Sequence, residues 1–195
     1  MENKILSVVV PVHNEHDTID KFYNTIQSLE TGRDITIEYV FADDGSTDDS
    51  LEIIKEIAKK DHRVRIIEKN NGGVSSARNI GIKESRGRFI SCLDSDDVIS
   101  VALLDCLTLA LERYPNVDTV FYEYVKFKDG IIPVIKQVKV SEEKIIHCQP
   151  NVLLRLHNYP WLRVVRRDFF DGNLFPDGII YEDSVTIPVL NARAC

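Results

Sequence analysis

Three features are scarce in this sequence, and each absence excludes a class of protein. Basic residues are not in excess: 24 Lys and Arg against 31 Asp and Glu give a net charge of −7, which argues against broad binding to nucleic-acid phosphates. No apolar run approaches the roughly 18 residues of a membrane span, and the apolar stretch near the N-terminus is too short for a secretory signal. The four cysteines lie far apart without a CxxC pair, which indicates buried or incidental thiols in a reducing compartment. The sequence therefore predicts a soluble, cytoplasmic protein with no nucleic-acid partner.

The residues that are present are typical of one globular α/β domain. The chain has 195 residues, of which 44% are hydrophobic and 28% charged, and this length is enough for one sizeable core. Strand-like and helix-like patterns alternate along the first two thirds. We expect strands at 5–12, 35–42, 64–68, 88–94 and 118–127, and helices at 16–29, 48–60, 74–85 and 101–114. This alternation predicts a mostly parallel sheet with helices on both faces.

The alternation stops after residue 128. Residues 129–142 are typical of a hairpin or an irregular edge, because Pro133 does not suit a central strand. Residues 149–157 favour a short helix, and residues 161–170 begin like a strand and end like a helix. No linker or repeat is visible, so we expect a single domain over residues 1–195.

Polar residues follow each of the first four expected strands. The four segments are PVHNE at 11–15, DDGSTDD at 43–49, KNNGG at 69–73 and DSDD at 94–97. The carboxyl ends of parallel strands share one edge of a sheet, and ligands bind in the crevice at that edge. The four loops are therefore expected to converge on one site.

Two of these loops have simpler interpretations. In DDGSTDD, Gly45 permits a left-handed turn, and Ser46 or Thr47 could cap the next helix, but this leaves Asp43 and Asp44 unexplained. The glycine pair at 72–73 could belong to an ordinary loop. It could also form an anion cradle, in which backbone N–H groups at a helix N-terminus face a phosphate.

The acidic loop after the fourth strand is the most informative. Asp94, Asp96 and Asp97 place three carboxylates in four positions, although one would satisfy a helix dipole. Asp94 and Asp96, two residues apart at a strand end, can point into one pocket. Oxygen ligands suit Mg²⁺ or Mn²⁺, and Mg²⁺ usually takes one or two carboxylates together with substrate phosphates. The loop therefore predicts a divalent metal site shared with a nucleotide diphosphate.

Taken in order, SVVVPVHNE, FADDGSTDDS, NNGGVSSARNIGI and FISCLDSDDV resemble the family 2 nucleotide-sugar glycosyltransferases of the GT-A fold. The later segments YPWLRVVRRDFF and LFPDGIIYEDS resemble the acceptor half of the same family. The resemblance runs from about Leu6 to Ser184. It implies a Rossmann-like sheet with a nucleotide-binding half at about 1–127 and an acceptor-side half at about 128–195. Such enzymes usually continue further past their acidic pair, which leaves open whether part of the acceptor platform is absent here.

The resemblance also implies roles for individual residues. Asp183 matches the catalytic base, and Glu182 supports it. Asp96 and Asp94 of the DxD motif match the ligands of Mn²⁺ or Mg²⁺. Nucleotide-sugar binding is implied for Pro11, Val12, Asn14, Glu15, Asp44, Asn70, Arg78, Asp94, Ser95, Trp161 and Arg163.

Two positions depart from the family pattern. His13 stands where Tyr or Phe is common, and Arg163 stands where Lys is frequent. The change at His13 is expected to alter stacking near the base. At position 163 either Arg or Lys could face the diphosphate, although the two are not equivalent.

The function that follows is a metal-dependent, inverting glycosyltransferase of hexosyl or N-acetylhexosaminyl type. The expected donor is a UDP-sugar, and the acceptor is a hydroxyl of a glycan or a lipid-linked saccharide, in polysaccharide biosynthesis. The expected location is the cytoplasm, with peripheral attachment to the inner face of the plasma membrane left open, as is the oligomeric state. One alternative is a non-catalytic nucleotide-sugar-binding module. A sugar-phosphate nucleotidylyltransferase is disfavoured, because such an enzyme carries a glycine-rich basic segment where PVHNEHDTID is acidic.

Overall fold

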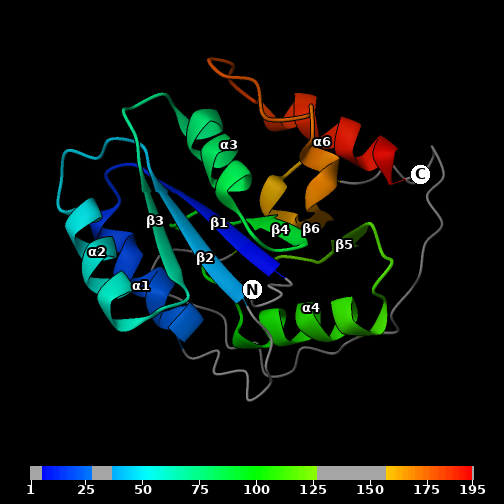
Figure 1. The fold of residues 1–195 in the computed structure, drawn as a ribbon, viewed down its shortest axis with the longest axis horizontal. Coiled ribbons are helices and arrows are strands. Elements are labelled where there is room, and N and C mark those ends of the chain that lie inside the picture. Colours follow the sequence, from blue (N-terminus) through cyan, green and yellow to red (C-terminus); the bar gives the residue numbers. More distant parts are fainter. Residues whose placement is uncertain (1–5, 28–36, 127–156, 195) are drawn as a thin grey trace.

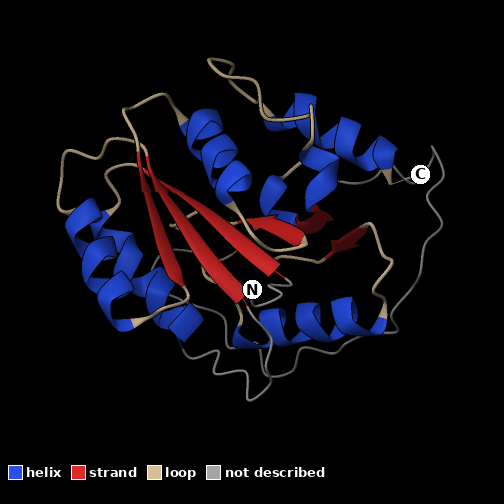
Figure 2. Ribbon diagram, in the orientation of Figure 1, coloured by secondary structure: helices blue, strands red, loops and turns tan. Residues whose placement is uncertain are grey.

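The computed structural model describes residues 6–27, 37–126 and 157–194. One six-stranded sheet runs through these residues in the order β3-β2-β1-β4-β6-β5 (Figures 1 and 2). The strands are β1 (Leu6–Val12), β2 (Ile37–Asp43), β3 (Val64–Glu68), β4 (Phe89–Cys92), β5 (Thr119–Phe121) and β6 (Arg163–Arg166). The helices are α1 (His16–Gln27), α2 (Ser50–Lys60), α3 (Val74–Glu84), α4 (Val101–Arg113) and α6 (Asp183–Arg193), with short 3₁₀ turns η1 (Pro160–Leu162) and η2 (Arg167–Phe170).

The direction of the strands decides which loops meet. β1 pairs in parallel with both β2 and β4, and β2 pairs in parallel with β3. β6 is antiparallel to both of its neighbours, β4 and β5. The carboxyl ends of β1 to β5 and the amino end of β6 therefore lie at one edge of the sheet. All four polar loops identified in the sequence leave from this edge.

Alternating side chains of the central strands build two cores. Leu6, Val8 and Val10 of β1 pack in a cluster with residues of α1, α2 and α4. Val9, between them, joins a second cluster with residues of α3, α6 and η2. Figure 1 shows α3 and α6 on one side of the sheet and α1, α2 and α4 on the other. The expected α/β fold, with helices on both faces of a mostly parallel sheet, is confirmed.

One expected strand is much shorter than its sequence pattern. The segment 118–127 was predicted as a strand, but β5 ends at Phe121. The register gives the reason: Phe121 lies opposite Arg163, the first residue of β6, and the chain before Arg163 forms the turn η1. Later residues therefore find no partner strand in the described sheet.

Other expectations near the C-terminus have mixed outcomes. The predicted change from strand to helix within 161–170 is confirmed, because β6 is followed directly by η2. The expected hairpin at 129–142 lies outside the described residues, as does nearly all of the expected helix at 149–157. None of the described helices is long and apolar enough to cross a membrane.

Candidate functional site

The loop after β1 interlocks with the loop after β2. The backbone N–H of Asn14 donates to Ser46 Oγ at 3.0 Å, and Asn14 Oδ1 accepts the N–H of Thr47 at 2.8 Å. The N–H of Glu15 donates to Ser50 Oγ at 2.7 Å, at the start of α2. Asn14 has a φ of 57°, a left-handed conformation that its short polar side chain tolerates. These bonds fix the ends of β1 and β2 as one unit.

The serine and threonine of this loop do not cap α2 as expected. α2 begins at Ser50, and the carboxylate of Asp48 accepts the N–H of Ser50 at 3.0 Å. Ser46 and Thr47 instead bond to Asn14, as described above. The two hydroxyls join the loops after β1 and β2, while Asp48 bonds the N–H of Ser50, the first residue of α2.

Asp44 is buried beneath the loop that follows β3. Its carboxylate accepts the N–H groups of Gly72 and Gly73 at 2.9 and 2.7 Å, and it also forms an ion pair with Lys69. In this structure the N–H groups of the glycine pair bind the Asp44 carboxylate, and whether this loop faces a phosphate stays a prediction. Gly73 has a φ of 85°, which orients its N–H at the start of α3. Asn70, beside these residues, is exposed.

Gly45 allows the second and third loops to touch. Its φ is 67°, as predicted, and a Cβ at this position would lie 2.8 Å from the backbone N of Asn71. Beside it, Asp43 is also buried: its Oδ2 accepts the N–H of Ser46 at 3.3 Å, while its Oδ1 has no partner. An unpaired buried carboxylate oxygen is uncommon in proteins, and it marks this edge as a polar site.

The acidic loop after β4 carries concentrated negative charge. Asp96 is exposed, Asp94 and Asp97 are partly buried, and Ser95 is buried between them. Burial and repulsion by Asp94 and Asp96 raise the pKa of Asp97 to about 6. No group of three or more His, Cys, Asp or Glu side chains is arranged to hold a metal within the described residues.

The carboxylate oxygens of the acidic loop fit a hard divalent cation such as Mg²⁺. Such an ion needs only one or two protein carboxylates when phosphate oxygens of a substrate supply further ligands. The mutual repulsion of the carboxylates is the observation that supports this fit. A cation beside Asp96 and Asp94 would offset it.

Arg78 of α3 joins the acidic loop to α6. Its guanidinium donates to Asp94 Oδ1 at 2.9 Å and to Glu182 Oε1 at 2.5 Å. Arg78 and Glu182 are only 6% and 9% exposed, and the two carboxylates help to keep the pKa of Arg78 above its ordinary value despite burial. The guanidinium also lies 5.6 Å from the ring centroid of Phe175. Arg78 therefore holds the start of α6 against the acidic loop.

The expected catalytic acid pair lies where α6 begins. Glu182 is the residue preceding the helix, and Asp183 is its first residue. Asp183 is partly exposed, and its Oδ1 accepts the N–H of Ser184 at 2.7 Å. Tyr181, directly before the pair, has a φ of 63°, which is a strained conformation for a bulky residue. The two carboxylates point to different surroundings: Glu182 to Arg78 and Asp183 to the surface.

Arg163 is buried between β6 and α6, away from solvent. Its guanidinium donates to Asn191 Oδ1 at 2.6 Å, to the carbonyl of Tyr159 at 3.3 Å and to the carbonyl of His157. Burial lowers the pKa of Arg163 to about 10. These three hydrogen bonds connect β6 to the segment before it and to α6, so in this structure the Arg163 side chain has a structural role.

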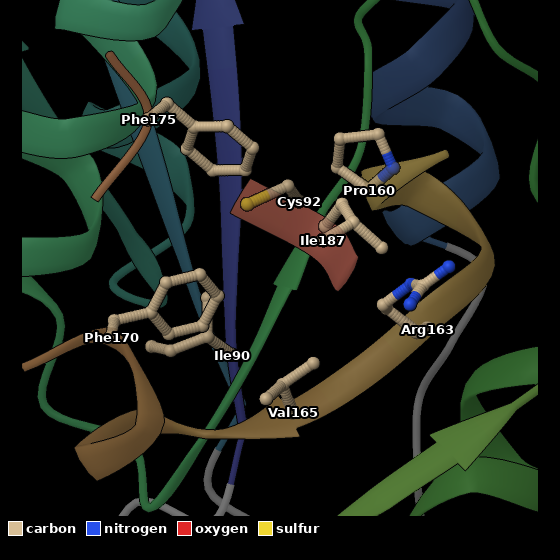
Figure 3. Close-up of a pocket in the computed structure, with 8 residues that line it drawn as sticks. All are labelled: Ile90, Cys92, Pro160, Arg163, Val165, Phe170, Phe175 and Ile187. Carbon is tan, nitrogen blue, oxygen red and sulfur yellow. The ribbon is translucent and has the colours of Figure 1, made fainter. Parts of the chain in front are cut away.

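A small cavity lies beside Arg163, lined also by Cys92 and Ile187 (Figure 3). Its volume of about 10 Å³ is room for about one water molecule. Burial raises the pKa of the Cys92 thiol to about 12, as expected for an inert buried cysteine. The cavity is a packing void and is too small for a nucleotide or a sugar.

Most of the predicted site residues come to one edge of the sheet. Pro11 and Val12 form the end of β1, and the N–H of Asp44 donates to the carbonyl of Val12 at 2.8 Å. The carboxylate of Glu15 accepts the hydroxyl of Thr18 at 2.7 Å in the first turn of α1. Whether these side chains meet a ligand stays a prediction, as it does for Arg163 and Trp161.

Sequence reasoning missed several residues of this edge. Lys69 was not recognised as the partner of Asp44, although it lies in a segment that was singled out. His157 was interpreted as a solvated or capping residue and Tyr159 was given no role, yet His157 stacks on Tyr159 and Tyr159 stacks on Trp161. The available signal was the recurrence of a ring at every second position from 157 to 161.

Comparison with known protein sequences gives a consistent picture. The profile described as "Glycosyl transferase family 2" matches residues 7–171. The chain is 33% identical over 193 residues to the uncharacterized glycosyltransferase EpsJ of Bacillus subtilis, covering 92% of this chain and 54% of EpsJ. It is 25% identical over 198 residues to the glycosyltransferase GlyG of Streptococcus pneumoniae, covering 95% of this chain and 64% of GlyG.

Solved structures share the fold. The crystal structure of Staphylococcus aureus TarS 1–349 superimposes with a TM-score of 0.77 at 21% identity, covering 96% of this chain and 55% of TarS. TarS 1–349 in complex with UDP-GlcNAc gives a TM-score of 0.75 at 22% identity, covering 94% of this chain and 52% of that one. The mannosyltransferase PcManGT of Pyrobaculum calidifontis, in complex with GDP-Man and Mn²⁺, gives 0.64 at 20% identity, covering 93% and 50%. The GT-A fold is confirmed, and the chain spans about half the length of most of these relatives.

Proposed function

The chain belongs to glycosyl transferase family 2, and from this premise we propose that it binds a UDP-sugar and transfers its sugar to a hydroxyl of a saccharide acceptor. The observation that carries the proposal is the convergence of Asp44, Asp94 and Asp96 with the start of α6 at one edge of the sheet. Such an edge is where open α/β sheets bind ligands. TarS, which shares the fold, has been solved with UDP-GlcNAc, which supports UDP as the nucleotide.

The nucleotide is held by the first three loops. Asp44 is fixed by two backbone N–H groups, so its carboxylate is preorganised to accept a hydrogen bond from the uridine. The contribution of these residues is positioning of the donor rather than chemistry.

The acidic loop takes the divalent cation, Mn²⁺ or Mg²⁺, through Asp96 and Asp94. When bound, the cation supplies charge neutralisation of the diphosphate and so makes it a better leaving group. PcManGT, which shares the fold, has been solved with Mn²⁺. The residues of the chain contribute the oxygen donors, and Arg78 keeps Asp94 oriented.

Asp183 is the general base of an inverting transfer. Its carboxylate removes the proton from the acceptor hydroxyl, and the hydroxyl oxygen attacks the anomeric carbon of the donor. The bond to the diphosphate breaks on the opposite face of the sugar, so the configuration inverts. Partial exposure at the first turn of α6 leaves Asp183 accessible to an acceptor, while the Arg78–Glu182 pair fixes where that turn begins.

The test is a pair of measurements on Asp183→Asn. Asn keeps the size and the helix-start hydrogen bond but cannot take a proton, so UDP release in the presence of acceptor and Mn²⁺ should fall by about 10² to 10⁴. UDP affinity, measured by calorimetry, should stay unchanged. Asp177→Asn, an exposed aspartate before the same helix, is the matched control and should transfer at the normal rate.

The outcomes separate the enzyme from a binding module. Near-normal transfer by Asp183→Asn would remove Asp183 from the mechanism and shift attention to Glu182. Tight UDP binding by the unsubstituted protein, without release of UDP from any donor in a panel of UDP-sugars, would support a non-catalytic module. Asp96→Ala should abolish the strengthening of UDP binding by Mn²⁺, which tests the metal assignment independently.

A further inference from the structure

Arg78 is a buried cation that contacts two carboxylates of the candidate site. It is 6% exposed; its Nη2 donates to Asp94 Oδ1 at 2.9 Å, and its Nη1 donates to Glu182 Oε1 at 2.5 Å. The central carbon of the guanidinium lies 5.6 Å from the ring centroid of Phe175. Two ion pairs and an aromatic ring therefore hold one positive charge in place beside the acidic loop.

Asp94 is the residue that Arg78 shares with a metal ion in the proposed function. Burial lowers the pKa of Arg78, and the charge of Asp94 contributes most to raising this pKa above its ordinary value. One oxygen of Asp94 takes the hydrogen bond, yet the side chain is 31% exposed and so is also open to solvent. The same carboxylate thus has two cationic partners, one built into the protein and one that comes from solution.

The charge of the acidic loop is offset by Arg78 when no ligand is bound. Burial, together with the charges of Asp94 and Asp96, raises the pKa of Asp97 to about 6, so the three carboxylates repel one another. Among the residues that the structure describes, Arg78 forms the only ion pair that any of these three carboxylates makes. The guanidinium therefore does, without a ligand, part of what a bound metal ion would do.

We propose that Arg78 keeps the affinity of the acidic loop for a free divalent cation low, so that the cation enters together with the nucleotide; this inference rests on the function proposed above. A cation on Asp94 shares that carboxylate with a guanidinium, and the two positive charges repel. A unit charge and a divalent ion about 6 Å apart repel, even in water, by an amount that corresponds to about tenfold in affinity. The phosphates of the nucleotide supply the attraction that Arg78 removes.

The bond from Arg78 also orients Asp94, and orientation has the opposite effect on a cation. If orientation were the larger effect, loss of Arg78 would weaken metal binding. An ion pair with a side chain as exposed as Asp94 contributes at most about fivefold, which is less than the repulsion between the two cations. The sign of the change in metal affinity therefore distinguishes a charge effect from a purely structural role.

The first probe is Mn²⁺ alone, and its free concentration is read from the electron paramagnetic resonance signal of the aqueous ion, without turnover. Glu182→Gln keeps the bond from Arg78 to Asp94 but removes the other charge that balances the guanidinium, so Mn²⁺ should bind at least about twofold more weakly. Arg78→Met in the Glu182→Gln background removes the guanidinium without leaving a buried unpaired carboxylate. Mn²⁺ should bind this double variant about tenfold more tightly than it binds Glu182→Gln.

Two further variants control for charge and for structure. Arg78→Lys keeps the positive charge and should bind Mn²⁺ within about twofold of the unsubstituted protein. Arg166→Met removes a unit charge opposite Phe89, at the start of β4, whereas the acidic loop follows the end of β4. Because solvent and salt screen this distance, Arg166→Met should change the Mn²⁺ affinity by less than about twofold. Thermal unfolding checks that each variant is folded, and tighter Mn²⁺ binding by Glu182→Gln would by itself overturn the proposal if the double variant unfolds.

The second probe, UDP, separates failure of this inference from failure of the proposed function. In the unsubstituted protein, UDP should tighten Mn²⁺ binding at least about tenfold. If it does, but the double variant binds Mn²⁺ alone no more tightly than Glu182→Gln, the inference is wrong and the proposed function stands. If neither UDP nor Mn²⁺ binds the unsubstituted protein, the proposed function itself is wrong.

Discussion

Replacing Arg78 with Met tests whether this residue holds the site together or grips the nucleotide. The guanidinium bridges Asp94, 16 residues further along the chain, and Glu182, 104 residues further along. Met preserves much of the apolar stem but removes both ion pairs. Arg78→Met should therefore destabilise the folded protein even when no nucleotide is present.

The expected loss follows from burial. Glu182 is 9% exposed, so removing its partner leaves a carboxylate nearly buried and unpaired, which typically costs about 3–5 kcal/mol. The side chain of Asp94 is 31% exposed, so its half of the bridge contributes at most about 1 kcal/mol. Glu182→Gln in the Arg78→Met background removes the unpaired charge and should recover about 2 kcal/mol.

The assay is urea-induced unfolding followed by circular dichroism, with Arg166→Met as the matched control. Arg166 also bridges two carboxylates, Asp118 and Asp168, but all three side chains are at least 37% exposed, so its loss should cost less than about 1 kcal/mol. If Arg78→Met is as stable as Arg166→Met, and Glu182→Gln recovers nothing, the bridge is not structural. Weakened UDP binding at normal stability would instead assign Arg78 to the nucleotide.

Three further predictions concern the loops and the base of the sheet. Asp44→Ala should weaken uridine and UDP equally in calorimetric titrations; a loss confined to UDP would put Asp44 beside the phosphates. Gly45→Ala should cost about 1–3 kcal/mol in urea unfolding, because φ is 67° and the added Cβ would lie 2.8 Å from Asn71 N, and a loss below about 0.5 kcal/mol would mean that the loop relaxes freely. Burial tends to raise the pKa of Glu38, but hydrogen bonds such as the one from Ser7 outweigh burial and lower this pKa. The folded protein is therefore stabilised at pH values above the pKa of the unfolded carboxyl group. This stabilisation is lost as the pH falls through the pKa of the folded state. Glu38→Gln should flatten the fall of the unfolding midpoint from about pH 6 to pH 3, and an unchanged acid limb would refute this.

Local patterns in the sequence were enough to predict the parallel half of the fold. The β-branched run of β1 indicated a strand buried on both faces, and its residues are almost all buried. Once β1, β2 and β4 were known to be parallel, the position of Asp44, Asp94 and Asp96 at one edge followed from topology. These predictions rest on periodicity and on the alternation of strands with helices, both of which can be recognised from short stretches of sequence.

Long-range pairings could not be predicted in the same way. Arg78 and Glu182 are 104 residues apart, and nothing near either residue indicates its partner. The insertion of β6 between β4 and β5 was equally hidden, because residues 161–166 carry no signal of the strand beside which they pair. The predicted length of β5 was wrong for the same reason, because β5 ends where its partner β6 begins and not where its own sequence pattern ends.

The position of β6 in the sheet also orders the assembly of the molecule during synthesis. β5 pairs only with β6 in the described sheet, and β4 gains its second neighbour from the same strand. Strands β1 to β4 can therefore associate while the ribosome is still adding residues, whereas β5 waits for at least 40 more residues before its partner emerges. Hydrogen exchange on nascent chains should protect the amides of β1 and β2 first and those of β5 last, so the edge of the sheet formed by β5 and β6 is completed only after β1 to β4 have paired.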